Sequence, residues 1–178
     1  MSPFEYMMMF LAIILGLGVA DMLQSLHKLL VSPGVRWHWL PPLWAAAVFL
    51  TILAMWIVNF DLDIGTGPIR YLRGSIVSCL LFLLSSSALP DVEAEFEPGS
   101  SLRGHFERRH RYVGILWIMF LAGSLLAMVS VGWQGSYLGW AMGGLLVLAV
   151  PTVLTRNIWY HTFFAVCLIA NAFLLILR

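Results

Sequence analysis

Histidine is the residue type in this chain with the widest chemical range, because a neutral imidazole can bind a metal ion or serve as an axial ligand to haem. The five histidines are His27, His38, His105, His110 and His161. No two of them have the spacing of a ligand pair within one helix, and Cys79 and Cys167 lie in separate apolar runs. Cysteines in such runs behave as small buried hydrophobes. We therefore assign no cofactor and no metal ligand, and keep a haem- or metal-binding membrane protein as an alternative.

A second candidate is a polar face at the end of the first apolar run. Gln24, Ser25 and Lys28 follow Asp21 by three, four and seven residues, which places all four on one face of a helix. Asp21 comes seventeen residues after Phe4, so it lies roughly 25 Å along the helix and close to the membrane interface. This face is either a site for an ion or a polar head group, or a wetted helix end with an internal Asp–Lys pair.

Three further polar residues complete the candidate polar site. His38 and His161 lie where their apolar runs enter the membrane, and Asn171 lies at membrane depth in the last run. An amide at that depth usually bonds a neighbouring helix, so we expect a structural role for Asn171. In a transporter, Asp21, His161 and Asn171 would instead line the path of the solute.

Two classes of function are excluded by what the sequence lacks. It contains no Gly-x-Ser-x-Gly, His-Glu-x-x-His or Cys-x-x-Cys motif and no glycine loop that could cradle a phosphate. We therefore predict no catalytic residue and a protein that is not an enzyme. Ten basic and nine acidic residues leave a net charge of +1, which gives no basic field to hold a nucleic acid.

The composition shows what must position these residues. Of the 178 residues, 61% are hydrophobic and 11% are charged, against roughly 45–50% and about 25% in soluble domains. A helix that spans a membrane needs about 20 mostly apolar residues. We expect an all-α bundle of about six transmembrane helices that forms a single transmembrane domain over residues 1–178. The predicted helices cover residues 4–31, 40–60, 72–90, 112–133, 137–154 and 158–177.

The one sizeable loop, residues 91–111, carries nearly half of the charged residues. It is either a solvated loop or contains a short helix that lays Leu102 and Phe106 on lipid with its arginines among the head groups. Seven basic residues flank the apolar runs on the side of this loop, and three flank them on the other side. The positive-inside rule then places the loop and all five histidines in the cytoplasm, with both termini on the periplasmic or exterior face.

Small residues predict where the helices approach closely. They are Ser75, Ser78, Ser85, Ser86, Gly123, Ala127, Gly139 and Gly143. We expect a leucine at Gly143 to disrupt the packing. The lipid bilayer is the main expected partner, and a protein partner or a second copy of the chain could bind through residues 91–111 or through these helix seams.

Two segments resemble a group of small, uncharacterised bacterial multi-pass membrane proteins. They are the opening Phe4-Glu5-Tyr6 with Ile13-Ile14-Leu15-Gly16-Leu17-Gly18, and the basic stretch from Leu102-Arg103 to His110-Arg111-Tyr112. The segments cover about a quarter of the chain. The resemblance implies a location in the bacterial inner membrane and carries no catalytic activity with it.

The sequence favours a non-enzymatic inner membrane protein that acts as an accessory, sensory or scaffolding component. Few polar groups are expected inside the bundle, one segment is strongly charged, and several seams suit helix packing. The first alternative is a small transporter or channel for an ion or small solute, and the second is the haem- or metal-binding protein.

Overall fold

The protein folds into a bundle of helices. The computed structural model describes residues 3–32, 35–61, 68–90, 101–130 and 137–177. Within these ranges the chain forms helices and one isolated bridge, between Arg36 and Ser101. The helices are α1 (Pro3–Val31), α2 (Leu40–Asp61), α3 (Pro68–Ala88), α5 (Leu102–Ser130), α6 (Tyr137–Leu154) and α7 (Ile158–Ile176). The predicted all-α class is confirmed.

The helices have the length and surface of membrane-spanning segments. Helices α1, α2, α3, α5 and α7 are long and apolar enough to cross a membrane, and α6 contains a shorter apolar segment, Gly139–Leu154. A helix satisfies its own backbone groups, which hydrocarbon cannot do. Large apolar side chains such as Leu17, Val147 and Phe173 are exposed on the outside of the bundle. The chain is therefore a multi-pass membrane protein.

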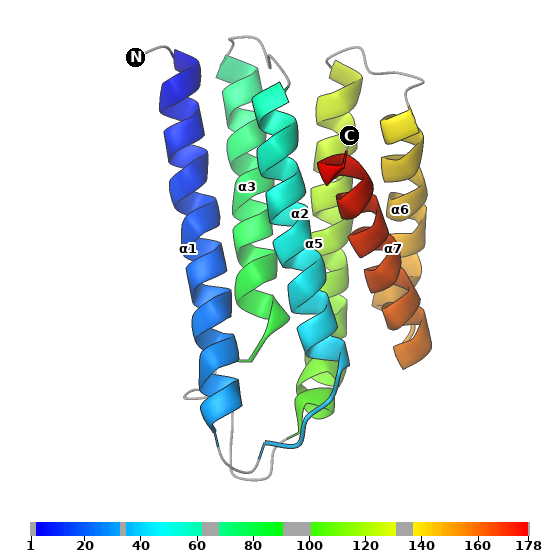
Figure 1. Cartoon of the computed structure of the whole chain (residues 1–178). Helices are drawn as coiled ribbons and strands as arrows, with labels where there is room; N and C mark the ends of the chain where they lie inside the picture. Colours follow the sequence, from blue (N-terminus) through cyan, green and yellow to red (C-terminus); the bar gives the residue numbers. More distant parts are fainter. Residues whose placement is uncertain (1–2, 33–34, 62–67, 91–100, 131–136, 178) are drawn as a thin grey trace.

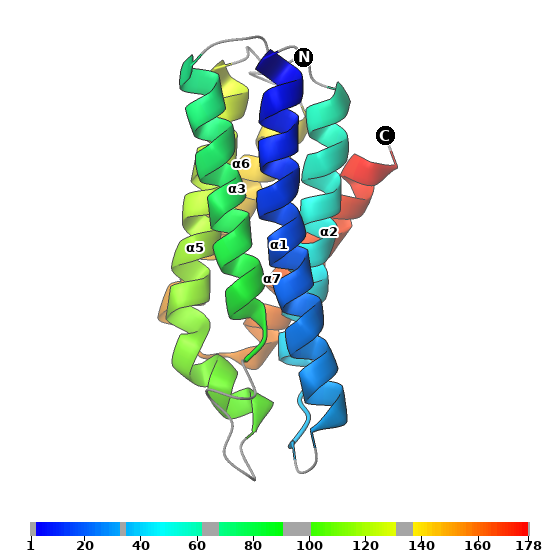
Figure 2. The same cartoon turned by 90° about the vertical axis from the view of Figure 1, so that its left-hand side faces the viewer.

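Consecutive helices run in opposite directions, so the two termini lie toward the same end of the bundle (Figure 1). Helices α1, α3, α5 and α6 form a row in which each packs on the next, and α2 and α7 pack on each other beside that row, as Figure 2 shows from the side. In the described part of the chain α1 contacts α3 and, less extensively, α2. It is the peripheral helix of the bundle.

The largest buried side chains lie between α5 and α7. They include Trp117 and Phe120 on α5 and Phe164 on α7. The Trp117 ring stands edge-on to Phe120 and Phe164, with centroid distances of 5.6 Å and 6.3 Å. No Cα atoms of α5 and α7 approach within 8 Å of each other in the described residues. Large aromatic rings are therefore needed to fill the space between the two helices, and edge-on contacts suit such rings.

The fourth helix begins earlier than predicted. Residues 91–111 were expected to form a charged loop, but α5 begins at Leu102 and runs unbroken into the apolar segment. Leu102 is 0% exposed and Phe106 is 8% exposed, so both side chains pack inside the bundle and the prediction that they lie on lipid is wrong. Burying these apolar groups favours extending the helix despite its charges. Residues 91–100 lie outside the described residues.

The other helix bounds are close to those predicted. Helix α3 begins at Pro68 and ends at Ala88, against the predicted 72–90, and the ends of α1, α2, α6 and α7 agree within one residue. The apolar runs therefore locate the helices, and the two largest disagreements, at the starts of α3 and α5, fall where charged residues continue a helix beyond its apolar part.

Two glycines mark the closest helix contacts. A Cβ atom on Gly18 would lie 2.5 Å from Oγ of Ser85 on α3, and a Cβ atom on Gly114 would lie 2.7 Å from Oγ1 of Thr152 on α6. A Cβ atom on Gly143 would meet nothing within 4 Å. The prediction that Gly143 lies at a close seam is therefore wrong, because small residues face open space as well as neighbouring helices.

Candidate functional site

Three of the five histidines are buried at one end of the bundle, which we call the histidine end. His105 and His110 lie in the first turns of α5, and His161 lies in the first turn of α7. His110 is 3% exposed and His161 is 1% exposed. His27 is exposed on α1, and His38 is half-buried just before α2. The histidine end lies opposite the termini, at the bottom of Figure 1.

Backbone carbonyls set the orientation and the tautomer of two of these rings. Nδ1 of His110 lies 2.8 Å from the carbonyl oxygen of Glu107, and Nε2 of His161 lies 3.0 Å from that of Thr155. A carbonyl oxygen can only accept, so each of these ring nitrogens carries the hydrogen and donates it. In the neutral form of each imidazole, the other nitrogen, Nε2 of His110 or Nδ1 of His161, therefore holds a lone pair.

Aromatic rings surround this pair of histidines. The centroids of His110 and His161 are 6.0 Å apart and their planes are inclined at 82°. Phe106 stands edge-on to His161 at 4.8 Å, and Trp44 of α2 lies 6.1 Å from the same imidazole. Trp44 also lies 5.8 Å from Phe164. The site is therefore built where side chains of α2, α5 and α7 meet.

Several buried polar atoms of this site have no hydrogen-bond partner among the described residues. They are Nε2 of His110, Nδ1 of His161 and the indole nitrogens of Trp44 and Trp117. Leaving such an atom without a partner costs about 1–3 kcal/mol, and native proteins contain few of them. Their concentration in one cluster makes the histidine end the candidate binding site.

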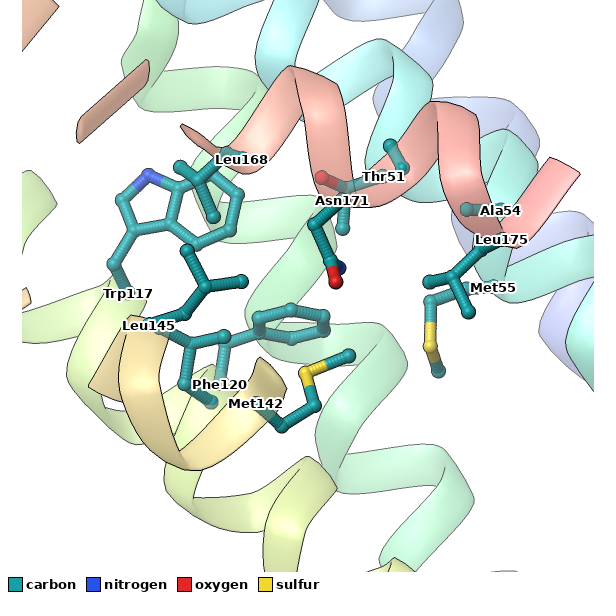
Figure 3. A pocket seen from close by; sticks show the side chains of 12 residues that line it. Thr51, Ala54, Met55, Trp117, Phe120, Met142, Leu145, Leu168, Asn171 and Leu175 are labelled. Carbon is teal, nitrogen blue, oxygen red and sulfur yellow. The ribbon is translucent and has the colours of Figure 1, made fainter. Parts of the chain in front are cut away.

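A separate hollow lies between α2, α5, α6 and α7, with an empty volume of about 300 Å³ that includes space open to the outside (Figure 3). Asn171 directs its amide into this hollow toward apolar side chains that include Phe120 and Met142. Thr51 also lines it, but its hydroxyl donates to the carbonyl of Ala47 on its own helix at 2.8 Å. Among the described residues, the Asn171 amide has no hydrogen-bond partner on another helix. The interhelical bond expected for Asn171 is therefore not seen there.

The polar face predicted on the first helix lies apart from both the histidine end and the hollow that contains Asn171. Its residues occupy exposed or half-buried positions of α1: Asp21, Gln24, Ser25 and Lys28. Within the described ranges α1 packs against α3 and α2 and does not reach α7. The structure therefore does not bring Asp21 together with His161 and Asn171.

His38 has a structural role at the start of α2. Its Nδ1 atom accepts a hydrogen bond of 3.2 Å from the backbone N–H of Leu40, and its ring stacks on Trp39 with a centroid distance of 5.5 Å. Desolvation and, second, the positive charge of Arg103 lower the pKa of His38 below its usual value of 6.5. The neutral ring is the form that caps the helix.

The sequence contained a signal for the part of the site that was missed. Leu102, Phe106, His110, Val113 and Trp117 follow one another at spacings of three or four residues, which is the period of one helix face. All five are buried. Extending the fourth helix backward along this period would have moved the first three from the loop into the bundle.

Comparison of the chain with protein-family models, with curated proteins and with solved structures gives no match in any of the three. The candidate site is therefore defined by its own chemistry, which is two buried imidazoles of fixed tautomer within a shell of aromatic rings.

Proposed function

We propose that the chain is a non-enzymatic membrane protein that serves as an accessory, sensory or scaffolding component of a bacterial inner membrane. A sensory role suits it best, because buried polar atoms are concentrated at the histidine end. The observation that carries the proposal is that seven serine and threonine hydroxyls within the bundle bond to their own helices, so they are not turned toward a path for a solute.

The hydrogen bonds of these hydroxyl groups are local. Ser85 donates to the carbonyl of Phe82 at 2.7 Å, and Thr152 donates to the carbonyl of Ala149 at 2.6 Å. The same pattern, with a carbonyl three or four residues earlier, holds for Thr51, Ser75, Ser86, Ser87 and Thr162. A transporter places polar groups along the route of its solute. In this bundle these seven hydroxyls instead bond to the backbone of their own helices.

Transport by the residues first considered is disfavoured for a second reason. The hollow that contains the Asn171 amide is lined mostly by apolar side chains. Asp21 is exposed on the peripheral helix α1, which does not contact α7 in the described part of the chain. A polar route that joins Asp21 to Asn171 is therefore not assembled.

A flux assay tests the proposal directly. The purified protein is reconstituted in vesicles, and leakage of protons, potassium ions and a neutral sugar is compared with that of protein-free vesicles. We expect no difference. The variant Asn171→Leu and its matched control Ala170→Leu, whose exposed position lies beside Asn171 on the same helix, should behave like the wild type. A flux that Asn171→Leu abolishes and Ala170→Leu preserves would establish transport and overturn the proposal.

We also propose that the histidine end faces the cytoplasm and both termini face the periplasm. Lys28, Arg36, Arg103 and Arg156 lie at the ends of helices on this side, as the positive-inside rule favours. The test uses a chain in which Cys79 and Cys167 are replaced by alanine and the exposed Arg108 by cysteine. We expect an impermeant thiol reagent to leave intact cells unlabelled at this position, and labelling from outside would reverse the orientation.

A further inference from the structure

We propose that His110 and His161 hold one copper(I) ion, bound by Nε2 of His110 and Nδ1 of His161. This inference goes beyond the accessory or sensory role and does not depend on it. A chain that transports a solute could still bind the ion, and a chain that binds no copper could still be an accessory component.

The two imidazoles are prepared as metal ligands. Each ring donates its N–H to a backbone carbonyl, of Glu107 or of Thr155, and such bonds orient the rings of metal-binding histidines in general. Each of the two remaining nitrogens is buried and has no hydrogen-bond partner in the described residues. A single cation bound by both of these nitrogens would therefore satisfy the two buried lone pairs.

The spacing of the rings fits one shared ion. A metal ion about 2.0–2.1 Å from a nitrogen of each of two imidazoles sets the ring centroids roughly 5 to 6.5 Å apart, depending on the angle at the metal. The centroids of His110 and His161 are 6.0 Å apart, which lies within that range. The separation of the two rings is therefore compatible with one shared ion.

The number of ligands selects the ion. Within the described ranges no group of three or more His, Cys, Asp or Glu side chains could hold a metal, so the protein offers two nitrogen donors here. Structural zinc sites take four ligands in a tetrahedron. Copper(I) has a filled d shell and is stable with two donors in a nearly linear arrangement, and imidazole is a suitable ligand for copper.

The surroundings favour a monovalent ion. The cost of moving an ion out of water rises with the square of its charge, so a single positive charge is the easiest to bury. Arg109 directly precedes His110 in the sequence, and its positive charge further disfavours a divalent ion. The rings of Phe106 and Trp44 lie beside this site, with centroids 4.8 Å and 6.1 Å from that of His161, and aromatic rings attract positive charge.

Haem does not fit this pair of histidines. A porphyrin held between two imidazoles needs a wide flat slot beside each ring. The rings of Phe106 and Trp44 already occupy the space next to His161. Within the described part of the chain, the aromatic shell therefore selects a single ion over a macrocycle.

The test measures copper(I) binding by the purified full-length protein under anaerobic, reducing conditions, in competition with a chromophoric copper(I) chelator. His110→Asn keeps an amide donor near the position of Nδ1 for the Glu107 carbonyl and removes Nε2 as a ligand. His161→Gln keeps a donor near the position of Nε2 for the Thr155 carbonyl and removes Nδ1. The matched control is His27→Asn, because His27 is exposed on α1.

We expect one copper(I) ion per wild-type chain and the same affinity in His27→Asn. Replacing a residue that only hydrogen-bonds to a metal ligand lowers metal affinity about 10–100-fold. Losing one of two ligands should therefore weaken copper(I) binding at least about 100-fold in His110→Asn and in His161→Gln. Copper X-ray absorption of the wild type, which needs no variant to fold, should show two imidazole nitrogens and no sulfur neighbour. No stoichiometric copper, a sulfur ligand, or full binding by either variant would overturn the inference. So would tighter binding of zinc, or a loss of copper in His105→Asn that His110→Asn does not show.

Discussion

Gly114 of α5 and Thr152 of α6 lie so close that a Cβ atom on the glycine would come within 2.7 Å of Oγ1 of the threonine. The same atom would lie 2.9 Å from Cγ2 and 3.3 Å from the backbone nitrogen of Val153. The hydroxyl of Thr152 is held by the carbonyl of Ala149 at 2.6 Å. Because a backbone atom stands behind the two side chains, the contact cannot be relieved by rotating one of them.

The first prediction follows from this contact. Gly114→Ala should lower the free energy of unfolding by about 1–3 kcal/mol, the usual cost of overpacking. The measurement is thermal or denaturant unfolding in detergent. The control is Gly144→Ala on α6, where a Cβ atom would meet nothing within 4 Å, so that variant should be as stable as the wild type or more stable because alanine favours helix. A greater loss in the control would show that α5 and α6 do not pack in this register.

A second prediction concerns the contact between α1 and α3. A Cβ atom on Gly18 would lie 2.5 Å from Oγ of Ser85 and 3.4 Å from Cα of Phe82. We expect Gly18→Ala to destabilise the protein, because the Ser85 hydroxyl must leave its bond to the Phe82 carbonyl. Ser85→Ala removes the clashing atom, so the double variant should lose at least about 0.5 kcal/mol less than the sum of the single variants. Strict additivity in detergent unfolding would show that the two residues are not in contact.

A third prediction tests whether the first turns of α5 are buried in the bundle or lie on the lipid surface. Phe106 is buried, whereas Tyr112 is exposed on the same helix. Phe106→Ala should destabilise the protein by about 3–5 kcal/mol, as expected for truncating a buried aromatic side chain. Tyr112→Ala, an exposed position, should change stability by about 0.5 kcal/mol or less. Equal effects on the unfolding midpoint would favour the surface helix.

A fourth prediction concerns pH. Burial and the nearby Arg103 lower the pKa of His38, while Glu107 opposes this shift. The folded protein therefore binds this proton less readily than the unfolded chain does, so the contribution of His38 is fully present above pH 6.5 and is lost as pH falls through the lowered pKa. His38→Asn keeps an acceptor for the N–H of Leu40 without titrating. The unfolding temperature of this variant should fall less between pH 7 and pH 5 than that of the wild type, and identical pH profiles would contradict a role for His38.

The apolar runs were sufficient to predict the helices, because lipid exposure demands an apolar surface along most of each span. They failed at the start of α5, where Arg103 and Glu107 form an exposed ion pair of 2.8 Å along the outer face while Leu102 and Phe106 are buried. The number of charged residues in a segment does not show that its charged side chains lie on one face of a helix and its apolar side chains on the other. A search for helical period over residues 102–117 would have shown it.

The candidate site was only partly predictable. His161 could be singled out from its place at the start of an apolar run, but its pairing with His110 depends on which helices lie side by side and on the size of the aromatic rings between them. Neither is encoded in a local pattern. Asp21 was singled out for the same kind of local reason, and its helix lies at the edge of the bundle, so a charged residue in an apolar run does not by itself indicate a site.

The serines of α3 have a consequence for how the protein is made. Ser75, Ser85, Ser86 and Ser87 each bond to a carbonyl of α3 itself, so their hydroxyls are satisfied before any neighbouring helix is present. In hydrocarbon an unsatisfied polar group costs several kcal/mol of free energy. A serine hydroxyl whose partner lay on another helix would remain unsatisfied until that helix had been inserted. Helix α3 can therefore leave the translocation channel for the lipid as soon as it is synthesised, before α5, on which it later packs, has emerged from the ribosome.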